Sequence, residues 1–172
     1  MKATDLLKQQ HRTAETLFAK IEGGHTDLLE DLASALAAHM TVEHEVFYPA
    51  ASAIDAQLIL ESLEEHALAE LALKRALATK PDDESFGARI AVLKELVLRH
   101  VQQEEGHLFP EAESQLSSEQ LEVLGENMEI RFNEVLIEGY AATLPNTYDL
   151  TTADLAHAQA ANSADAYRQT LA

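Results

Sequence analysis

Two stretches of this chain repeat one pattern: His39-Met-Thr-Val-Glu43-His-Glu-Val-Phe-Tyr-Pro49 and His100-Val-Gln-Gln-Glu104-Glu-Gly-His-Leu-Phe-Pro110. In each stretch, a histidine is followed four residues later by a glutamate and ten residues later by a proline. Residues four apart lie one above the other on the same face of a helix. Each stretch can therefore direct an imidazole and a carboxylate toward a common point, and this donor pair suits iron, manganese or zinc.

A histidine and a glutamate at the same spacing occur once more in each half of the chain, as His11 with Glu15 and His66 with Glu70. The histidines lie on apolar stripes that have the three-four spacing of a core-facing helix. The four stripes are Leu7, His11, Ala14, Phe18 and Ile21; Leu32, Leu36, His39, Glu43 and Phe47; Ile59, Leu63, His66, Glu70, Leu73 and Leu77; and Leu93, Val97, His100, Glu104 and Leu108. Four such helices with short connections predict an all-α, up-down-up-down four-helix bundle.

Helix-ending signals divide the chain accordingly. We predict helices over about 4–22, 27–49, 55–80 and 83–110, and a fifth over 117–140 that opens with the capping box Ser117-Ser-Glu-Gln120. Residues 1–140 then form one domain, the bundle plus the fifth helix. Residues 141–172 form a C-terminal tail that is partly helical from Thr152 or extended, and packed outside or flexible.

Composition and charge narrow the possible functions. The chain has 172 residues, 47% of them hydrophobic, which is enough for one globular domain. A formal net charge of -18 argues against nucleic acid and against an anionic membrane surface, because both are bound through clustered Lys and Arg. The absence of cysteine excludes disulfides, thiolate metal sites and Fe–S clusters. Without a signal-peptide-like start or a long uncharged apolar stretch, we expect a soluble cytoplasmic protein.

Buried carboxylates and imidazoles at one level of a bundle need a cation. Each unpaired polar group costs roughly 1–3 kcal/mol, and a bare charge costs more. The chain has only 12 Lys and Arg, and none interrupts the stripes. Six to eight donors exceed what one four-coordinate ion needs, so the pattern predicts two metal ions that retain open coordination positions.

These motifs resemble a known family, the hemerythrin-like or HHE cation-binding domain, over about residues 1–140. The resemblance rests on His11, His39-x-x-x-Glu43, His66 and His100-x-x-x-Glu104, and on the following Phe-Tyr-Pro49 and Leu-Phe-Pro110. It implies an oxo- or hydroxo-bridged di-iron centre in a four-helix bundle. It also implies that His11, His39, His66 and His100 are terminal ligands and that Glu43 and Glu104 are bridges.

The chain departs from the oxygen-carrying members of that family at two positions. Those members have a second histidine four residues after the third-helix histidine, and an aspartate five residues after the fourth-helix histidine. Here these positions are Glu70 and Glu105. A hard anionic oxygen at Glu70 would suit ferric iron, which makes long-lived reversible oxygenation less favourable. The pattern is closer to that of iron-cluster repair proteins and iron-sensing hemerythrin-like domains.

The other titratable residues have weaker cases. Glu70 is a candidate ligand or a partner of a ligand, Glu15 is expected to support a ligand or face solvent, and Glu105 could replace Glu104 as a bridge if the helix is distorted. We expect no role for His25, His44, His107 and His157, and we expect Tyr48 only to pack. A ferritin-like site is disfavoured, because it needs Glu-x-x-His on two helices and only Glu104 with His107 supplies it intact.

The predicted function is that of a non-haem di-iron protein that binds or reacts with dioxygen, peroxide or nitric oxide. An alternative is an iron-responsive sensor or iron donor without catalytic turnover, in which metal occupancy changes the stability of the bundle. A third hypothesis is an acidic helical interaction protein whose histidines are structural. The sequence leaves open whether the protein is an enzyme.

Overall fold

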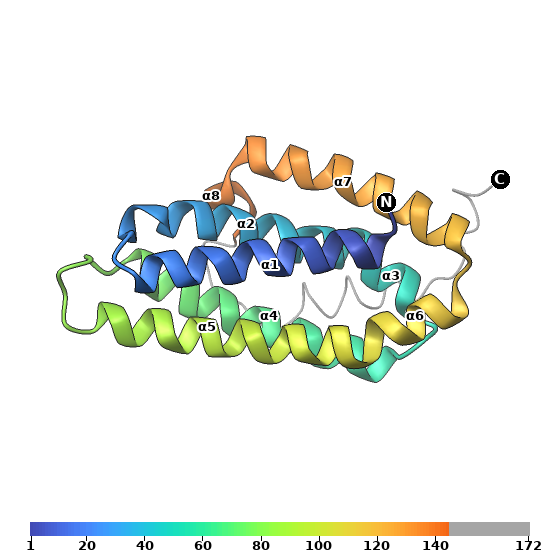
Figure 1. Cartoon of the computed structure of the whole chain (residues 1–172), viewed down its shortest axis with the longest axis horizontal. Coiled ribbons are helices and arrows are strands. Elements are labelled where there is room, and N and C mark those ends of the chain that lie inside the picture. The colour runs from blue at the N-terminus through green and yellow to red at the C-terminus, as the bar shows by residue number, and fades with distance from the viewer. Residues whose placement is uncertain (145–172) are drawn as a thin grey trace.

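The computed structural model describes residues 1–144, so the expected helix from Thr152 and His157 lie outside the described residues. Four long helices form the bundle: α1 (Ala3–Glu22), α2 (Leu29–Val42), α4 (Ala56–Leu77) and α5 (Phe86–Gln103). They run alternately up and down along the long axis (Figure 1). Over the described range there is no strand. The predicted all-α, up-down-up-down bundle is confirmed.

Shorter elements complete the bundle. A 3-10 turn (Thr26–Leu28) leads into α2, and α3 (Tyr48–Ala51) and α6 (Phe109–Gln115) prolong the second and fourth bundle helices. The additional helix α7 (Ser118–Glu138) crosses α1 and α2 on the outside of the bundle (Figure 1), and α8 (Tyr140–Thr143) follows it. Within this range no helix is long and apolar enough to cross a lipid bilayer.

Local sequence explains where several helices begin and end. After α1, Gly24 adopts a φ of 104°, a conformation that favours glycine. Asp55 caps α4, since its Oδ1 accepts from the Leu58 backbone N–H at 2.9 Å. At α7 the predicted capping box is present, with Ser117 and Gln120 each accepting from the other's backbone N–H.

The two repeated motifs contain a feature that the sequence did not predict. Directly after Val42 and after Gln103 the backbone widens into π-helical turns, Glu43–Phe47 and Glu104–Leu108, before α3 and α6 resume. Pro49 and Pro110 are the second residues of α3 and α6, where the missing proline N–H and the bulky ring disturb an ordinary helical ladder. The π turns accommodate these prolines, and the helices continue beyond them.

The core has two apolar halves separated by a polar layer. One half lies toward the Gly23–Gly24 end, and its largest fully buried members are Phe18, Leu32, Leu73, Ile90 and Leu93. The other half lies toward the π turns and contains Leu7, Phe47, Leu108, Phe109, Leu124 and Met128. Leu144, just after α8, is buried against the first half.

Candidate metal centre

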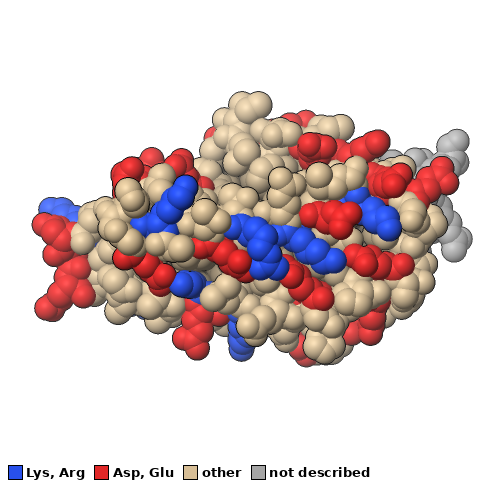
Figure 2. All heavy atoms as spheres, viewed as in Figure 1, with Lys and Arg blue, Asp and Glu red and all other residues tan. Residues whose placement is uncertain are grey.

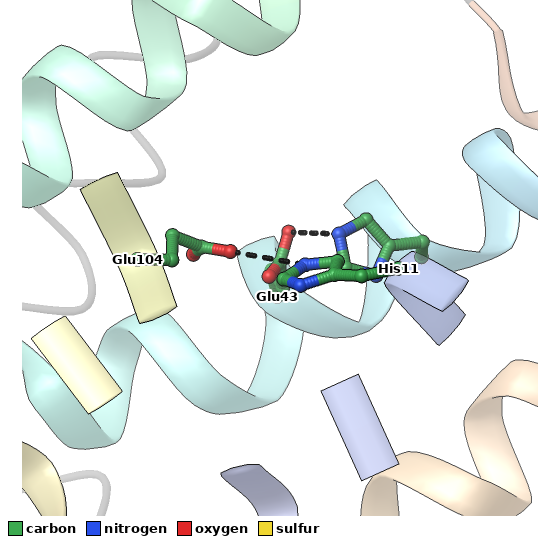
Figure 3. A group of neighbouring side chains, drawn as sticks. His11, Glu43 and Glu104 are labelled. Carbon is green, nitrogen blue, oxygen red and sulfur yellow. Dashed lines mark ion pairs between the residues drawn. The ribbon is translucent and has the colours of Figure 1, made fainter. Parts of the chain in front are cut away.

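Six buried polar side chains form the layer between the two halves of the core. The four histidines come one from each bundle helix, and Glu43 and Glu104 are fully buried where the π turns begin. The side chains are His11, His39, His66, His100, Glu43 and Glu104. Figure 3 shows Glu104 entering from the side opposite His11, with Glu43 between them. The sequence-predicted ligands other than Glu70 are thus brought together.

The donor atoms fall into two groups that share one carboxylate. The first group is His11, His39, Glu43 and Glu104, and the second is Glu43, His66 and His100; in each, one donor atom per residue lies within 4.8 Å of the others. Glu43 Oε2 lies 3.2 Å from His39 Nε2 and 3.3 Å from His66 Nε2. Its carboxylate therefore stands between two positions, where a bridging ligand would be placed.

Glu104 also reaches both halves of the layer. Its Oε2 lies 3.3 Å from Nε2 of His11, in the first group, and 3.3 Å from Nε2 of His100, in the second. His66 and His100 bring their Nε2 atoms within 3.0 Å of each other. Two facing ring nitrogens can both bind the same cation, whereas a hydrogen bond between them uses only one proton.

Each imidazole is held in place through its outer nitrogen, Nδ1, by a side chain from the preceding helix around the bundle. The four contacts are His39 Nδ1 to Gln10 Oε1 at 2.9 Å, His66 Nδ1 to His44 Nε2 at 2.8 Å, His100 Nδ1 to Glu65 Oε2 at 3.1 Å and His11 Nδ1 to Glu105 Oε1 at 2.8 Å. Together they form a closed ring. A proton on Nδ1 leaves the Nε2 lone pair directed into the centre, which is the tautomer a metal requires.

The direction of each helix decides which glutamate reaches the layer. The residues four after a histidine lie toward the π turns on α2 and α5, but toward the opposite end on α1 and α4, which run the other way (Figure 1). Glu43 and Glu104 therefore enter the layer. Glu15 pairs with Arg12, and the half-buried Glu70 belongs to neither donor group.

Two expectations, on His44 and Tyr48, need correction, and Glu105 has a different place from the alternative that the sequence left open. Glu105 does not replace Glu104; it accepts from His11 Nδ1 and pairs with Arg12. His44 was expected to have no role, yet it contacts His66. Tyr48 was expected only to pack, but its hydroxyl donates to Glu104 Oε1 at 3.0 Å. His25 and His107 are exposed.

Sequence reasoning missed the outer partners, although a signal for them exists. Gln10, His44, Glu65 and Glu105 are each the direct neighbour in sequence of a residue in the layer. Adjacent residues on a helix point about 100° apart, so when one faces the bundle axis its neighbour faces the adjacent helix. A polar residue beside each inward-facing donor is therefore positioned to contact the next histidine.

Without a cation the two carboxylates adopt opposite protonation states. Burial and the charge of Glu104 raise the pKa of Glu43 well above its usual range. Burial also acts to raise the pKa of Glu104, but His100 and His11 outweigh it and lower that pKa well below its usual range. The metal-free layer thus holds Glu43 protonated and Glu104 ionised.

The imidazoles differ in the same way. Burial, reinforced by the neighbouring imidazoles, lowers the pKa values of His39 and His66 well below the ordinary value. Burial also acts to lower the pKa of His100, but the nearby carboxylates of Glu104 and Glu65 outweigh this effect and raise that pKa to about 9. A cation that enters this layer must displace the protons of His100 and Glu43.

Unsatisfied atoms in the layer support a cation there. His11 Nε2, Glu43 Oε1 and Glu104 Oε2 are buried and have no hydrogen-bond partner within the described chain. His11 Nε2 and Glu104 Oε2 are close, but their geometry is not that of a hydrogen bond. Unpaired buried groups of this kind cost roughly 1–3 kcal/mol each, and a bound cation would satisfy them. Imidazole and carboxylate donors suit iron, manganese or zinc.

A small cavity adjoins the four imidazoles, and neither Glu43 nor Glu104 lines it. Apolar side chains form most of its wall, chiefly Ala14, Leu36, Ala69, Leu73 and Val97, and the four imidazoles, Gln10 and Glu65 also line it. Its volume is about 20 Å³, which has room for a molecule about the size of water. The centre is thus next to a space that admits small, weakly polar molecules.

Comparison with known proteins agrees with this geometry. The family model described as Hemerythrin HHE cation binding domain matches residues 2–112. The crystal structure of a Hemerythrin HHE cation binding domain-containing protein from Mycobacterium kansasii is 25% identical, with a TM-score of 0.73, and the match covers 94% of this chain and 99% of that one. A protein from Nostoc sp. described as a DNA nickase is 27% identical over 128 residues, which is 71% of this chain. The chain spans only 36% of that relative's length. The match over residues 2–112 shows that this chain belongs to the hemerythrin HHE cation-binding domain family.

Proposed function

We propose that this chain is a non-haem di-iron protein that binds or reacts with small oxidants, namely dioxygen, peroxide or nitric oxide. The observation that carries the proposal is the position of Glu43, whose carboxylate belongs to both groups of buried donors. His11 and His39 would hold one ion, His66 and His100 the other, and Glu43 and Glu104 would bridge them. Two bound irons would supply redox change and open coordination positions.

The surrounding residues prepare the site for this chemistry. The ring of outer contacts fixes the imidazole tautomers and orientations before metal enters. Burial of the whole layer excludes bulk water, and the adjoining cavity of about 20 Å³ has room only for a small molecule. No larger substrate is implied by this arrangement.

The proposal does not extend DNA nicking to this chain. The similarity covers about a third of that relative, and a net charge of -18 repels a phosphate backbone. On the face shown in Figure 2, the positive side chains gather along the middle, over α1, and acidic side chains lie among and around them. Arg12 and Lys8 in α1 pair with Glu105 and Glu113, so these charges are already matched.

Iron reconstitution tests the proposal. Metal-free protein loaded anaerobically with ferrous iron should bind about two irons per chain and develop near-ultraviolet charge-transfer bands when exposed to air. The His39→Ala/His100→Ala variant should lose both the iron and the bands, whereas a His25→Ala control should keep them, since His25 is exposed. Iron that stays well below one per chain, without the bands, would rule out the proposal.

A sensor or iron donor is a second candidate because the layer is unsatisfied without metal. Three buried atoms gain partners only when a cation binds, so metal occupancy should change the stability of the bundle. Thermal unfolding with and without iron, measured beside peroxide and nitric oxide consumption, distinguishes the two. Steady consumption with little change in Tm favours the enzyme, and a large rise in Tm without consumption favours the sensor.

A further inference from the structure

The two repeated motifs differ at one position that faces the centre. Tyr48 and Phe109 each come five residues after the inward-facing glutamate and one residue before the proline. The π turns widen the helix by one residue, which places residues five apart on the same face. The Tyr48 ring stacks on His66 and the Phe109 ring on His11, with ring centroids 5.8 Å apart in both cases. The two rings thus occupy corresponding positions, and they differ only in the hydroxyl that Tyr48 carries.

The hydroxyl lies beside the smaller of the two donor groups, the one that contains His66 and His100. The first group offers four donor residues and the second only three. Tyr48 Oη is 3.5 Å from Glu43 Oε2 and 3.5 Å from His66 Nε2, two of the three donors in the second group. These separations are shorter than the 4.8 Å that bounds each group. Tyr48 is only 3% exposed, so its hydroxyl has no alternative contact with water.

We propose that Tyr48 is an additional protein donor of the second metal position, binding the ion there as a phenolate. The inference rests on the proposed function, because it requires metal at the site. In the metal-free protein the phenol keeps its proton and donates to Glu104. On metal binding the phenol would give up that proton to solvent, and its oxygen would turn from Glu104 to the ion. A phenolate is a hard anionic oxygen donor and favours ferric iron over softer ions.

This assignment makes the two metal positions unequal. Each would be held by two imidazoles and the two shared carboxylates, and the second would have a phenolate in addition. Phe109 cannot supply an oxygen to the first position, although its ring has the corresponding place. We expect the second position to hold ferric iron more tightly than the first, because its phenolate is present only there.

Visible absorption and resonance Raman spectra of the air-oxidised, iron-loaded protein test the assignment. A phenolate bound to ferric iron gives a charge-transfer band in the visible range and enhanced ring vibrations of the tyrosinate. The wild type should show both, and the zinc-loaded protein neither. Tyr48→Phe should lose the band and retain about one iron per chain, since only the second position is weakened. The Tyr140→Phe control, which removes a half-buried phenol on α8, should retain the band and both irons.

Each contrary outcome has a distinct meaning. Wild-type protein that binds two irons without a phenolate band would overturn the assignment of Tyr48 and leave the proposed function standing. A band that persists in Tyr48→Phe would also overturn the assignment. If the wild type has no band but Tyr48→Phe loses iron, the hydroxyl serves only to orient Glu104. Wild-type protein that binds no iron would contradict the proposed function itself. The wild-type spectrum decides these cases even if the variant does not fold.

Discussion

Glu65 shows, at the scale of single residues, how a side chain that touches no metal can control the centre. It is buried on α4, and its Oε2 accepts from His100 Nδ1 at 3.1 Å while Arg99 contacts its other oxygen at 3.2 Å. Glu65 therefore fixes the orientation of His100 and increases the electron density on its Nε2. The other three outer contacts should act in the same way, but Glu65 has an exposed glutamate, Glu64, beside it that serves as a matched control.

Replacing Glu65 by glutamine should weaken metal binding without unfolding the bundle. The variant keeps the size of the side chain and removes its charge, so His100 becomes a weaker donor. Affinity should fall about 10–100-fold, as measured by competition with a chromophoric chelator. Glu64→Gln removes the same charge from an exposed position and should leave affinity unchanged. Equal affinities for the two variants would show that the outer contact has no influence.

The residues of the layer could be predicted because each carries its own signal. A histidine or glutamate on an apolar stripe conflicts with burial, and six such conflicts at regular spacing indicate one site. Glu70 and Glu15 fit the same spacing but lie on helices of opposite direction, which a spacing rule does not register. Tyr48 carried no such signal, since a tyrosine on an apolar helix face is ordinarily a packing residue.

At the scale of elements, the π turns could not be predicted from the sequence. The prolines indicated an interruption, but an ending, a kink and a widened turn are all consistent with a proline. The choice depends on tertiary packing, because Glu43 and Tyr48 both face the centre only if an extra residue is accommodated between them. By contrast, the caps at Asp55 and Ser117 depend on local chemistry and were predictable.

The docking of α7 on the start of α1 depends on Gly125. A Cβ at this position would overlap the carbonyl oxygen of Met1 and lie 3.0 Å from the backbone nitrogen of Ala3. Gly125→Ala should therefore lower the free energy of unfolding by about 2 kcal/mol or more, because backbone atoms must move. Gly87→Ala is the matched control, since nothing lies within 4 Å of its added Cβ and alanine favours helix. Urea denaturation measures both, and equal stabilities would contradict this packing.

Over the whole molecule, the polar layer should give the metal-free protein a maximum of stability near pH 6.5. His39 and His66 have depressed pKa values, so below about pH 6.5 the unfolded chain takes up protons that the fold excludes, and stability falls with acid. His100 has a raised pKa of about 9, so its contribution is complete below about pH 6.5 and is lost as the pH rises to about 9. The pKa of Glu43 is also raised, so Glu43, like His100, contributes stability that is lost as the pH rises.

The stabilisation that metal binding provides should depend on pH in the opposite way above about pH 6.5. Between about pH 6.5 and 9, loss of the proton on His100 assists binding of the ion, so the stabilisation due to metal should increase while the metal-free protein weakens. Thermal unfolding of chelator-treated and metal-loaded protein across this range measures both trends. His100→Gln should abolish most of the alkaline loss in the metal-free form. Parallel pH profiles for the two forms would contradict the assigned protonation states.

The bundle itself follows from patterns that extend over whole helices. Four stripes of three-four spacing and short connections determine an up-down arrangement, because each apolar face must be buried against another. The cavity beside the imidazoles could not be predicted, since the side chains that line it, Ala14 and Ala69 among them, come from different helices. Its position depends on how the helices pack in three dimensions.

The central claim is that two metal ions share the carboxylate of Glu43. The most direct test is an anomalous difference map from crystals of the iron-loaded protein, recorded at the iron absorption edge. We expect two peaks inside the bundle, one beside His11 and His39 and one beside His66 and His100, with the Glu43 carboxylate between them. A single peak, or no peak among these side chains, would contradict the claim.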